Sequence, residues 1–460
     1  MKKFLTLRTP KLCALMLLIA PLSAYATNGY FLIGYGAKSR GMGGVGVAYA
    51  QDAIAGAFNP AGMADAGVST MRIDFGLELF NPPRAVVHSS DTLGSPVSVT
   101  NETSGSNEFL IPSFGAIYKF NRKLYLGMAV IGNGANTRYH QSVPTLPTCV
   151  NGDTSGGTGS YFFNFNCNAD SNTVGVQLLQ AQMLPGVAYQ VNKNNIVGAS
   201  LAIGVQQFRA YGLGAFEDLG FAGAGATGTS GNGNDYSYGL GVRFGWLGKF
   251  LDKKLTLGVN YASRVYMTQF NKYDQLFAEH GDFDIPENYS IGLAFKLTDK
   301  LTVAADVQQI NYSNVASIGN PGPIDPVDLN PLCPGVDPAI CQLGGDLGMG
   351  FGWSDVTAYK IGLNYDYSNA WSFRIGYNHA DTPIQKDQVL FNMLAPATVE
   401  DHITLGASYR PSKNVEWTAN IVHAFENTIS GPTAFGNLPG DDAAISMKIN
   451  TLGISFAYNL

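Results

Sequence analysis

Stretches of about ten residues in which large apolar side chains alternate with small or polar ones recur along most of the chain. The last stretch is the clearest: Leu452, Ile454, Phe456, Tyr458 and Leu460 share one face, and small or polar residues share the other. A strand with one face toward lipid and the other toward a barrel interior has this period of two. The pattern therefore predicts membrane-spanning β-strands.

Fourteen such stretches occur, and the connections between them alternate in length. Six connections are short, such as those at 121–122 and 368–369, while the others are long and rich in Gly, Pro, Asn and Asp, such as 81–108 and 314–353. Short turns at one end and long loops at the other are typical of outer-membrane barrels. Because an unpaired strand edge in lipid leaves backbone groups without partners, the sheet must close. We expect an all-β fold, a 14-stranded antiparallel transmembrane β-barrel over 67–460, with strands over 68–80, 109–120, 123–139, 175–191, 195–211, 234–247, 254–270, 285–297, 300–313, 354–367, 370–381, 400–411, 414–427 and 445–460.

The first residues are typical of a signal peptide. A basic segment precedes a short apolar run over 12–22, and Ala24-Tyr25-Ala26 matches an A-x-A cleavage site, so we expect residues 1–26 to be removed. Removing the four basic residues of this segment lowers Lys+Arg from 28 to 24 against 34 Asp+Glu, and the net charge falls from −6 to −10. An acidic exported protein lacks the clustered cations that nucleic-acid binding requires.

The segment 27–66 is rich in Gly and Ala, poor in charge and too irregular for a strand, and it ends near Asn59-Pro60-Ala61. A fourteen-stranded barrel has a lumen too wide for its own side chains to fill. We therefore expect this segment to be a plug, or hatch, inside the lumen. The turn at Asn59, Pro60 and Ala61 would end the plug and set its exit into the first strand, or be only a turn before that strand.

Two groups of residues stand out: the plug pattern Ala37, Arg40-Gly41, Gly44, Ala48, Asp52 and Asn59-Pro60-Ala61, and the pattern Trp371-Ser372-Phe373-Arg374 with Asp381-Thr382-Pro383. Both groups resemble the OMPP1/FadL/TodX family, the FadL-type outer-membrane transporters of long-chain fatty acids and related hydrocarbons. The resemblance implies capture of a ligand at the outer loops, transfer to a pocket near the N-terminus of the plug, and a shift of the plug. Release would then be lateral, through a wall opening at a kinked third strand.

The third predicted strand contains a break that fits this mechanism. Its alternation meets Gly132, Asn133, Gly134, Ala135 and Asn136, and Gly and Asn within a strand indicate a bulge or an inward kink. Such a break in a lipid-facing wall is costly unless the freed backbone groups face a cavity. We expect a gate formed by this break and the end of the plug; an ordinary bulge near the outer rim is the alternative.

Candidate ligand contacts come from the plug and from the lumen-facing cations. Tyr30, Phe31, Leu32 and Ile33 would line a pocket or anchor the plug, and Arg209 and Arg374 are candidates to bind a fatty-acid carboxylate. Such cations could instead hold the plug, and a neutral hydrocarbon would need none. Burial of a chain is worth about 0.8 kcal/mol per CH₂, so the tail would dominate the affinity.

Four cysteines of the mature chain fall in two close pairs within predicted outer loops. We expect disulfides Cys149–Cys167 and Cys333–Cys341 in an oxidising compartment; free thiols or a metal site are the alternatives. The six histidines lack metal-ligand spacing. The match of Gly41, Gly43 and Gly46 to a dinucleotide fingerprint lacks the strand–turn–helix context and indicates close packing instead.

The sequence thus favours a monomeric outer-membrane barrel, not an enzyme and without a cofactor, that takes up hydrophobic compounds, foremost long-chain fatty acids. Its expected partners are the ligand and outer-membrane lipids, with no nucleic acid. One alternative is uptake of neutral aromatic or aliphatic hydrocarbons. Another is a surface barrel that transports nothing and binds a partner through its loops.

Overall fold

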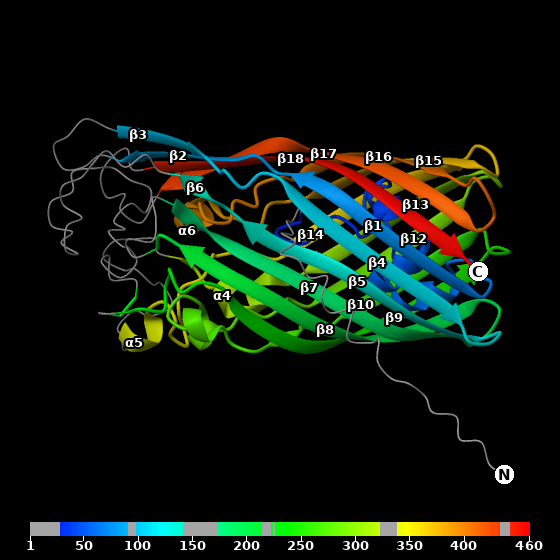
Figure 1. Cartoon of the computed structure of the whole chain (residues 1–460), viewed down its shortest axis with the longest axis horizontal. Helices are drawn as coiled ribbons and strands as arrows, with labels where there is room; N and C mark the ends of the chain where they lie inside the picture. Colours follow the sequence, from blue (N-terminus) through cyan, green and yellow to red (C-terminus); the bar gives the residue numbers. More distant parts are fainter. Residues whose placement is uncertain are drawn as a thin grey trace, which may run out of the picture.

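The structure, a computed structural model, describes residues 28–90, 98–140, 173–213, 222–223, 226–322, 338–432 and 442–460. The predicted signal peptide, residues 1–26, lies outside these ranges. In the described residues, the strand segments form one antiparallel sheet that closes into a barrel, because β1 pairs with β18 on one edge and β4 on the other (Figure 1). The segments are β1 Met71–Asn81, β2 Arg84–Ser90, β3 Ser98–Thr103, β4 Phe109–Lys119, β5 Leu124–Asn136, β6 Tyr139–His140, β7 Thr173–Gln190, β8 Asn195–Tyr211, β9 Asp235–Phe250, β10 Leu255–Ala262, β11 Tyr266–Met267, β12 Asn288–Lys296, β13 Leu301–Ile310, β14 Val356–Asp366, β15 Trp371–Ala380, β16 Asp401–Tyr409, β17 Val415–Pro432 and β18 Asp442–Asn459.

Several segments are parts of one longer strand. β1 and β2 both pair with β18, β5 and β6 both pair with β7, β10 and β11 both pair with β9, and β3 and β4 lie against the successive parts of the first strand. Joined in this way they give the fourteen antiparallel strands that the alternation predicts, and this prediction is confirmed.

One predicted loop is corrected. The range 81–108 contains the strand segments β2 and β3, which extend the first two strands beyond Pro82-Pro83. Proline cannot donate to a strand ladder, and the sequence of the hairpin that follows is rich in Ser and Thr. The alternation that reveals the other strands is therefore hidden here.

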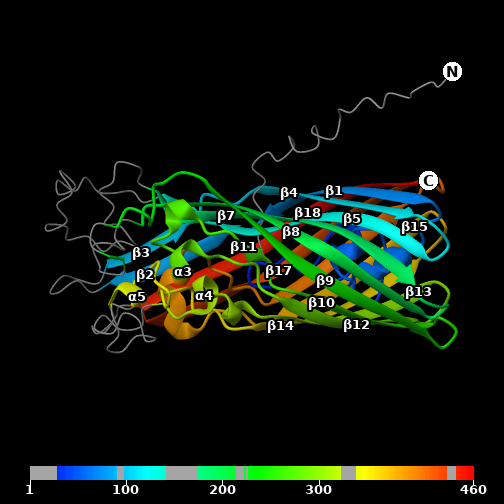
Figure 2. The same cartoon turned by 90° about the horizontal axis from the view of Figure 1, so that it is seen from below.

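Residues 28–70 lie inside the barrel, where Figures 1 and 2 show them in dark blue in the half nearer the short turns. This segment, called the plug below, contains only short helices: α1 Ala37–Arg40, η2 Ala53–Ala57 and η3 Pro60–Ala64. Asp52 and Asn59 cap the second and third, each accepting a hydrogen bond from the backbone N–H two residues ahead. Proline follows Asn59 as the first helical residue, where its missing N–H costs nothing.

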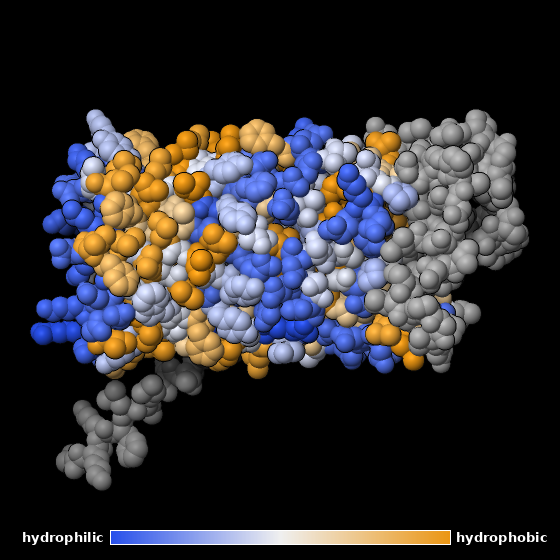
Figure 3. All heavy atoms as spheres, turned by 180° about the vertical axis from the view of Figure 1, so that it is seen from behind, coloured by the Kyte–Doolittle hydropathy of each residue, from blue (hydrophilic) through white to orange (hydrophobic). Residues whose placement is uncertain are grey.

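The outer wall carries an apolar band. On the face shown in Figure 3, hydrophobic residues gather next to the end with the short turns, and the rim of that end is hydrophilic. Exposed aromatic residues lie at both heights of the wall, for example Trp371, Tyr409 and Trp417 near the turns and Tyr236 and Tyr238 toward the loops. Aromatic girdles beside an apolar band are expected at the two membrane interfaces.

Short helices occupy the loop end of the barrel. They are η5 Asn271–Tyr273, α3 Ala278–Gly281, η6 Tyr312–Asn314, α4 Ala316–Gly319, α5 Pro338–Cys341, η7 Lys386–Gln388 and α6 Val389–Asn392. Among the described residues, no helix combines the length and the apolar character needed to cross a membrane.

Candidate functional site

Hydrogen bonds from inward-facing side chains tie the plug to the barrel wall. Asp306 accepts from the Gly46 and Val47 amides (2.7 and 3.0 Å), and Arg243 donates to the Ala57 carbonyl (2.7 Å). Lys360 donates to the Ile33 carbonyl at 2.8 Å. These strand residues form hydrogen bonds with backbone groups of the plug that have no partner in a helix or strand. The plug is therefore held along its whole length.

A buried ion cluster joins the start of the plug to β17 and β1. Glu416 Oε2 lies 2.7 Å from Lys38 Nζ and 3.0 Å from Arg72 Nη2, and its Oε1 lies 3.2 Å from Arg410 Nε. Arg72 in turn forms a bidentate salt bridge with Asp74. One buried carboxylate thus balances cations from the plug and from the wall.

Two plug groups have pKa values moved toward neutrality. Burial lowers the pKa of Lys38 to about 8, with a further contribution from Arg72, while Glu416 acts in the opposite direction. Burial and the neighbouring Asp74 raise the pKa of Asp52 to about 6. At pH 7 Lys38 therefore stays mostly cationic and can keep its pair with Glu416.

The glycine-rich part of the plug approaches the wall at backbone distance. Gly43 adopts φ 71°, its amide donates to Thr404 Oγ1 (2.8 Å), and a Cβ there would lie 2.7 Å from the carbonyls of Ile361 and Tyr377. Opposite it, Gly376 leaves room in β15. This close contact explains the glycines that resemble a dinucleotide motif, and it agrees with the packing interpretation.

The N-terminal residues of the plug, Tyr30, Phe31, Leu32 and Ile33, are all buried. Tyr312 holds the first two, because its hydroxyl accepts from the Tyr30 and Phe31 amides at 3.2 and 3.3 Å and donates to the Asn28 carbonyl at 2.5 Å. The Tyr30 ring contacts Phe31, Tyr312, Phe283 and Trp353 with centroids 5.1 to 6.3 Å apart. Tyr312 and Trp353 come from the loop between β13 and β14, whose sequence gave no sign of this role.

Small cavities lie between the plug, the wall and the loops. The inner apolar cavity, about 30 Å³, has a lining without a charged side chain among the described residues: Tyr30, Ala135, Val176, Leu178, Phe208, Phe277, Phe283, Ile318, Phe351, Trp353 and Ala395. The outer apolar cavity, also about 30 Å³, is lined by Val176, Phe208, Leu213, Leu276, Phe277, Ser317, Leu343, Met349, Gly350, Phe351, Phe391 and Leu394. Four side chains line both cavities and so form the partition between them: Val176, Phe208, Phe277 and Phe351.

Phe31, Leu32 and Ile33 line a third, polar cavity of about 20 Å³ together with Arg243, Asp306 and Lys360. A volume of this size holds a water molecule or two and no larger ligand. The plug residues predicted to contact a ligand therefore line cavities, and those cavities are small.

The wall has a gap in its pairing between β4 and β5. The ladder runs from Lys119↔Tyr125 to Phe114↔Val130 and goes no further, whereas β5 pairs with β7 without a register shift as far as Asn136↔Gln177. Above the gap, the bridge Ser104↔Tyr139 joins the two strands again. We call this interval, with Phe109–Ser113 on one side and Ile131–Asn136 on the other, the lateral window.

The predicted break in the third strand, at Gly132, Asn133 and Gly134, falls inside the lateral window. The irregularity lies on the edge toward β4 and not in the ladder with β7. Along the outward face of β5 the exposed fraction falls from 38% at Leu126 to 8% at Asn136, so this face of the strand is covered within the window.

The plug touches the lateral window through its N-terminal part. Asn133 Oδ1 accepts from the Leu32 amide at 3.3 Å and from the Tyr35 hydroxyl at 3.2 Å. A cavity of about 10 Å³ lies between these plug residues and the window strands, bordered by Ser113 and Gly132 among others. The plug thus closes the window from inside.

Asn59, Pro60 and Ala61 lie elsewhere. Asn59 Nδ2 donates to the carbonyls of Trp246 (3.0 Å) and Val259 (3.3 Å), on β9 and β10, and Pro60 follows it into η3. Asn59 thus bonds backbone carbonyls of β9 and β10 and not the break in the third strand. These three residues anchor the plug, and the hydrogen bonds to the break in the third strand come from Leu32 and Tyr35.

The two candidate carboxylate ligands point in different directions. Arg374 faces the lumen, donates to Gln51 of the plug and to Ser408 (both 2.8 Å), and so holds the plug. Arg209 lies on the outward face of β8, because Phe208 and Ala210 take the buried positions, and its guanidinium lies 4.4 Å from the Tyr211 ring centroid. Neither residue lines the apolar cavities.

Most of the predicted disulfides fall outside the described residues. Cys149, Cys167 and Cys333 lie there, whereas Cys341 in α5 is disulfide-bonded. The Cys149–Cys167 and Cys333–Cys341 pairings stay predictions. Within the ranges that the structure describes, no cluster of three or more His, Cys, Asp or Glu side chains is arranged to bind a metal ion.

Residues 147–433 match the family model described as outer membrane protein transport protein (OMPP1/FadL/TodX). A curated protein of Chlorobium limicola, described as an uncharacterized protein in the 5′ region of the phosphoenolpyruvate carboxykinase gene, is 32% identical over 124 residues. That match covers 26% of this chain and 55% of the relative, so the chain spans about half the length of the relative.

Solved structures share the fold over nearly the whole chain. The toluene transporter TodX of Pseudomonas putida is 18% identical with a TM-score of 0.64, covering 93% of this chain and 99% of that one. The Ralstonia pickettii toluene transporter TbuX is 17% identical (TM-score 0.59; 93% and 99%). A Pseudomonas aeruginosa FadL homologue is 14% identical (TM-score 0.62; 94% and 99%).

Proposed function

This chain belongs to the outer membrane transport protein family OMPP1/FadL/TodX, and from that premise we propose that its cargo is a small neutral hydrophobic compound, foremost a monoaromatic hydrocarbon. It is an outer-membrane transporter of hydrophobic compounds and not an enzyme. The proposal concerns which compound it carries and by which route. It departs from the long-chain fatty acid that the sequence favours.

The inner apolar cavity carries the proposal. Its described lining is apolar, and the two cations expected to bind a carboxylate are engaged with the plug or face outward. A fatty-acid carboxylate brought into this cavity would lose its hydration without gaining a partner, which is costly. A neutral aromatic ring loses only its contact with water and gains packing against Tyr30, Phe283 and Trp353.

The similarity to toluene transporters and to the monoaromatic hydrocarbon channel CymD supports the same class of cargo. At 16 to 18% identity, this similarity is one of fold. Transport of long-chain fatty acids is the alternative function, and the test below distinguishes it from transport of aromatic hydrocarbons.

The route begins in the outer apolar cavity and passes the partition of Val176, Phe208, Phe277 and Phe351 into the inner one. Ala135 of β5 borders the inner cavity, so a compound there lies directly inside the lateral window. Movement of the plug that breaks the bonds of Leu32 and Tyr35 to Asn133 would open the window toward lipid. Release between β4 and β5 then delivers the compound into the apolar part of the membrane.

Uptake of labelled toluene and of labelled oleate, measured separately in cells that lack similar transporters, tests this proposal. We expect the protein to raise toluene uptake well above the vector level and to leave oleate uptake near it. The opposite preference would establish the fatty-acid function, and no uptake of either compound would favour a barrel that binds a partner through its loops.

A variant that fills the lateral window tests the route. In Gly132→Val with Gly134→Val, new side chains obstruct the outer mouth of the gap, and we expect toluene uptake to fall toward the vector level. Ala199→Val, on the outward face of a fully paired part of β8, is the matched control and should retain uptake. Full uptake by a correctly folded window variant would rule out lateral release but not the choice of cargo.

A further inference from the structure

Two guanidinium groups meet at one aromatic ring on the outer wall, beside the upper edge of the lateral window. The Cζ atoms of Arg138 and Arg209 lie 5.1 and 4.4 Å from the Tyr211 ring centroid. Tyr211 is only 8% exposed although it occupies an outward position, because the two cations cover it. Arginine groups stacked on an aromatic ring keep their N–H edges free for an anion.

The backbone arrangement brings these residues together. Gly175 of β7 is the cross-strand partner of Tyr211 and has no side chain, and the Cα of Arg138 lies 3.2 Å from the position that a Cβ on Gly175 would take. The side chain of Arg138 therefore extends over Gly175 to reach a ring two strands away. Arg209 reaches the same ring from two residues back on β8.

Within the part of the chain that the structure describes, no carboxylate pairs with Arg138 or Arg209, and the buried Nε of Arg209 has no hydrogen-bond partner. Two like charges held close together without an anion are unfavourable. The arrangement therefore fits an anion that is supplied from outside the chain.

The height of the cluster identifies the anion. Arg209 lies fourteen residues along β8 from Asn195 at the turn end, which for a tilted strand is a rise of roughly 35 Å, beyond an apolar band of about 25 Å. The exposed Tyr236, partner of Gln207, lies one outward position below it and belongs to the aromatic girdle. At this level the surrounding anions are the phosphates of outer-leaflet lipid.

We propose that Arg138, Tyr211 and Arg209 form a binding site for the phosphate group of an outer-leaflet lipid. The phosphate accepts hydrogen bonds from the terminal N–H groups of both guanidinium groups, and the acyl chains lie against the wall beside the lateral window. Arg209 thus binds an anion of the membrane and not the transported ligand. The site is independent of the cargo proposed above.

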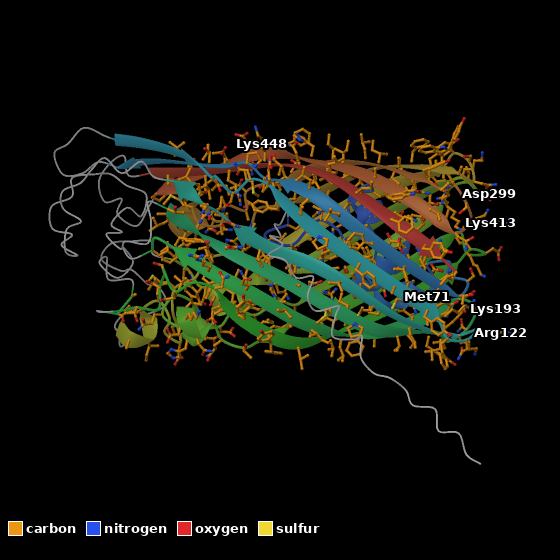
Figure 4. The ribbon with its side chains drawn as sticks, in the orientation of Figure 1. Met71, Arg122, Lys193, Asp299, Lys413 and Lys448 are labelled. Atoms are coloured by element: carbon orange, nitrogen blue, oxygen red, sulfur yellow. The ribbon has the colours of Figure 1, made fainter. Side chains whose placement is uncertain are left out.

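Binding of fluorescent lipid A, the phosphorylated glycolipid of the outer leaflet, to the folded full-length protein in detergent micelles tests this site. We expect Arg138→Gln with Arg209→Gln to weaken the affinity at least tenfold, because charge-assisted bonds from both groups are lost. The matched control is Arg122→Gln with Lys193→Gln, two exposed cations at the turn end (Figure 4), which should bind within twofold of the native protein.

Dephosphorylated lipid A separates phosphate recognition from binding of acyl chains, and we expect it to bind the native protein and the double variant equally weakly. Equal affinity of the native protein for both lipids, or no effect of the double variant, would overturn the proposal. Complete displacement of lipid A by inorganic phosphate would also overturn it, since the site would then serve a free anion. The single variant Arg138→Gln, at an exposed position, provides a second test and should weaken binding about threefold or more.

Discussion

The side chain of Asn59 is fully buried, and its polar atoms all have backbone partners. Its Nδ2 donates to the carbonyls of Val47, Trp246 and Val259, and its Oδ1 accepts from the Ala61 amide. The wall residue Gly245 makes room for it, because a Cβ there would lie 1.9 Å from Oδ1. This one amide connects two parts of the plug to β9 and β10.

Replacing Asn59 by Ala leaves buried carbonyls and an amide without partners, and we expect it to destabilise the plug by about 2–4 kcal/mol. Hydrogen–deuterium exchange should show faster exchange in residues 53–64, while exchange in the barrel strands stays slow. Asn271→Ala is the matched control, since Asn271 is exposed and lies in a loop helix. Unchanged protection of the plug in Asn59→Ala would show that the hydrogen bonds of Asn59 are not what holds it.

At the same scale, the alternation of apolar and polar residues places some charged side chains on the correct face of their strand and cannot place others. Lys360 and Arg374 face the lumen as their strands predict. Arg209 lies on the outward face of β8. Near the outer end of a strand, however, both faces are covered, one by lipid and the other by loops. The hydrophobicity of a residue there no longer indicates which face it occupies. Its neighbours Arg138 and Tyr211 become recognisable only when three strands are aligned.

At the scale of elements, the plug is fixed to β17 by the carboxylate of Glu416. We expect Glu416→Gln to leave Lys38 and Arg72 buried without this anion and to destabilise the folded protein by about 3–5 kcal/mol. The loss should appear first as plug movement, seen as bursts of ion conductance in planar bilayers and as faster protease cleavage near Lys38.

The same strand offers the control for that change. Glu426 pairs with Lys448 at 3.7 Å on the outside of the barrel, where both side chains are about half exposed, and Figure 4 shows Lys448 on the outer surface. An exposed pair of this kind is worth less than about 1 kcal/mol. Glu426→Gln should therefore leave conductance and stability unchanged, and equal effects of the two variants would exclude a specific role for the buried cluster.

The strands themselves are largely predictable, because lipid on one side enforces a period of two. The fourteen strands and the alternation of short and long connections follow from that rule. The hairpin of β2 and β3 does not, since Pro82-Pro83 separates β2 from β1 and the sequence of the hairpin is rich in Ser and Thr. The lateral window could be predicted only in part. Gly132 and Asn133 indicate an irregular strand, but which neighbouring strand loses its pairing depends on the register between strands.

At the scale of the whole molecule, the lumen is filled from two sides. The plug occupies the half near the turns, and the loop helices with Tyr312 and Trp353 cover its N-terminus from the other end. The four cavities described above hold about 10 to 30 Å³ each. We expect a barrel filled in this way to conduct neither ions nor hydrophilic solutes, and under the proposed route uptake of a hydrophobic compound requires local movement near Tyr30 and the window.

Deleting residues 28–66 tests this description of the lumen. The barrel strands close through β1 and β18 without the plug, so we expect the variant to fold, which heat-modifiable migration on gels can verify. Its inward side chains, among them Arg243, Asp306, Lys360 and Glu416, would then be hydrated and line a wide aqueous pore. We expect steady ion conductance in planar bilayers and increased entry of hydrophilic antibiotics, both absent from the native protein. If the folded variant stays closed to ions, the loops alone seal the barrel, and movement of the plug would not be sufficient to open the path for the cargo.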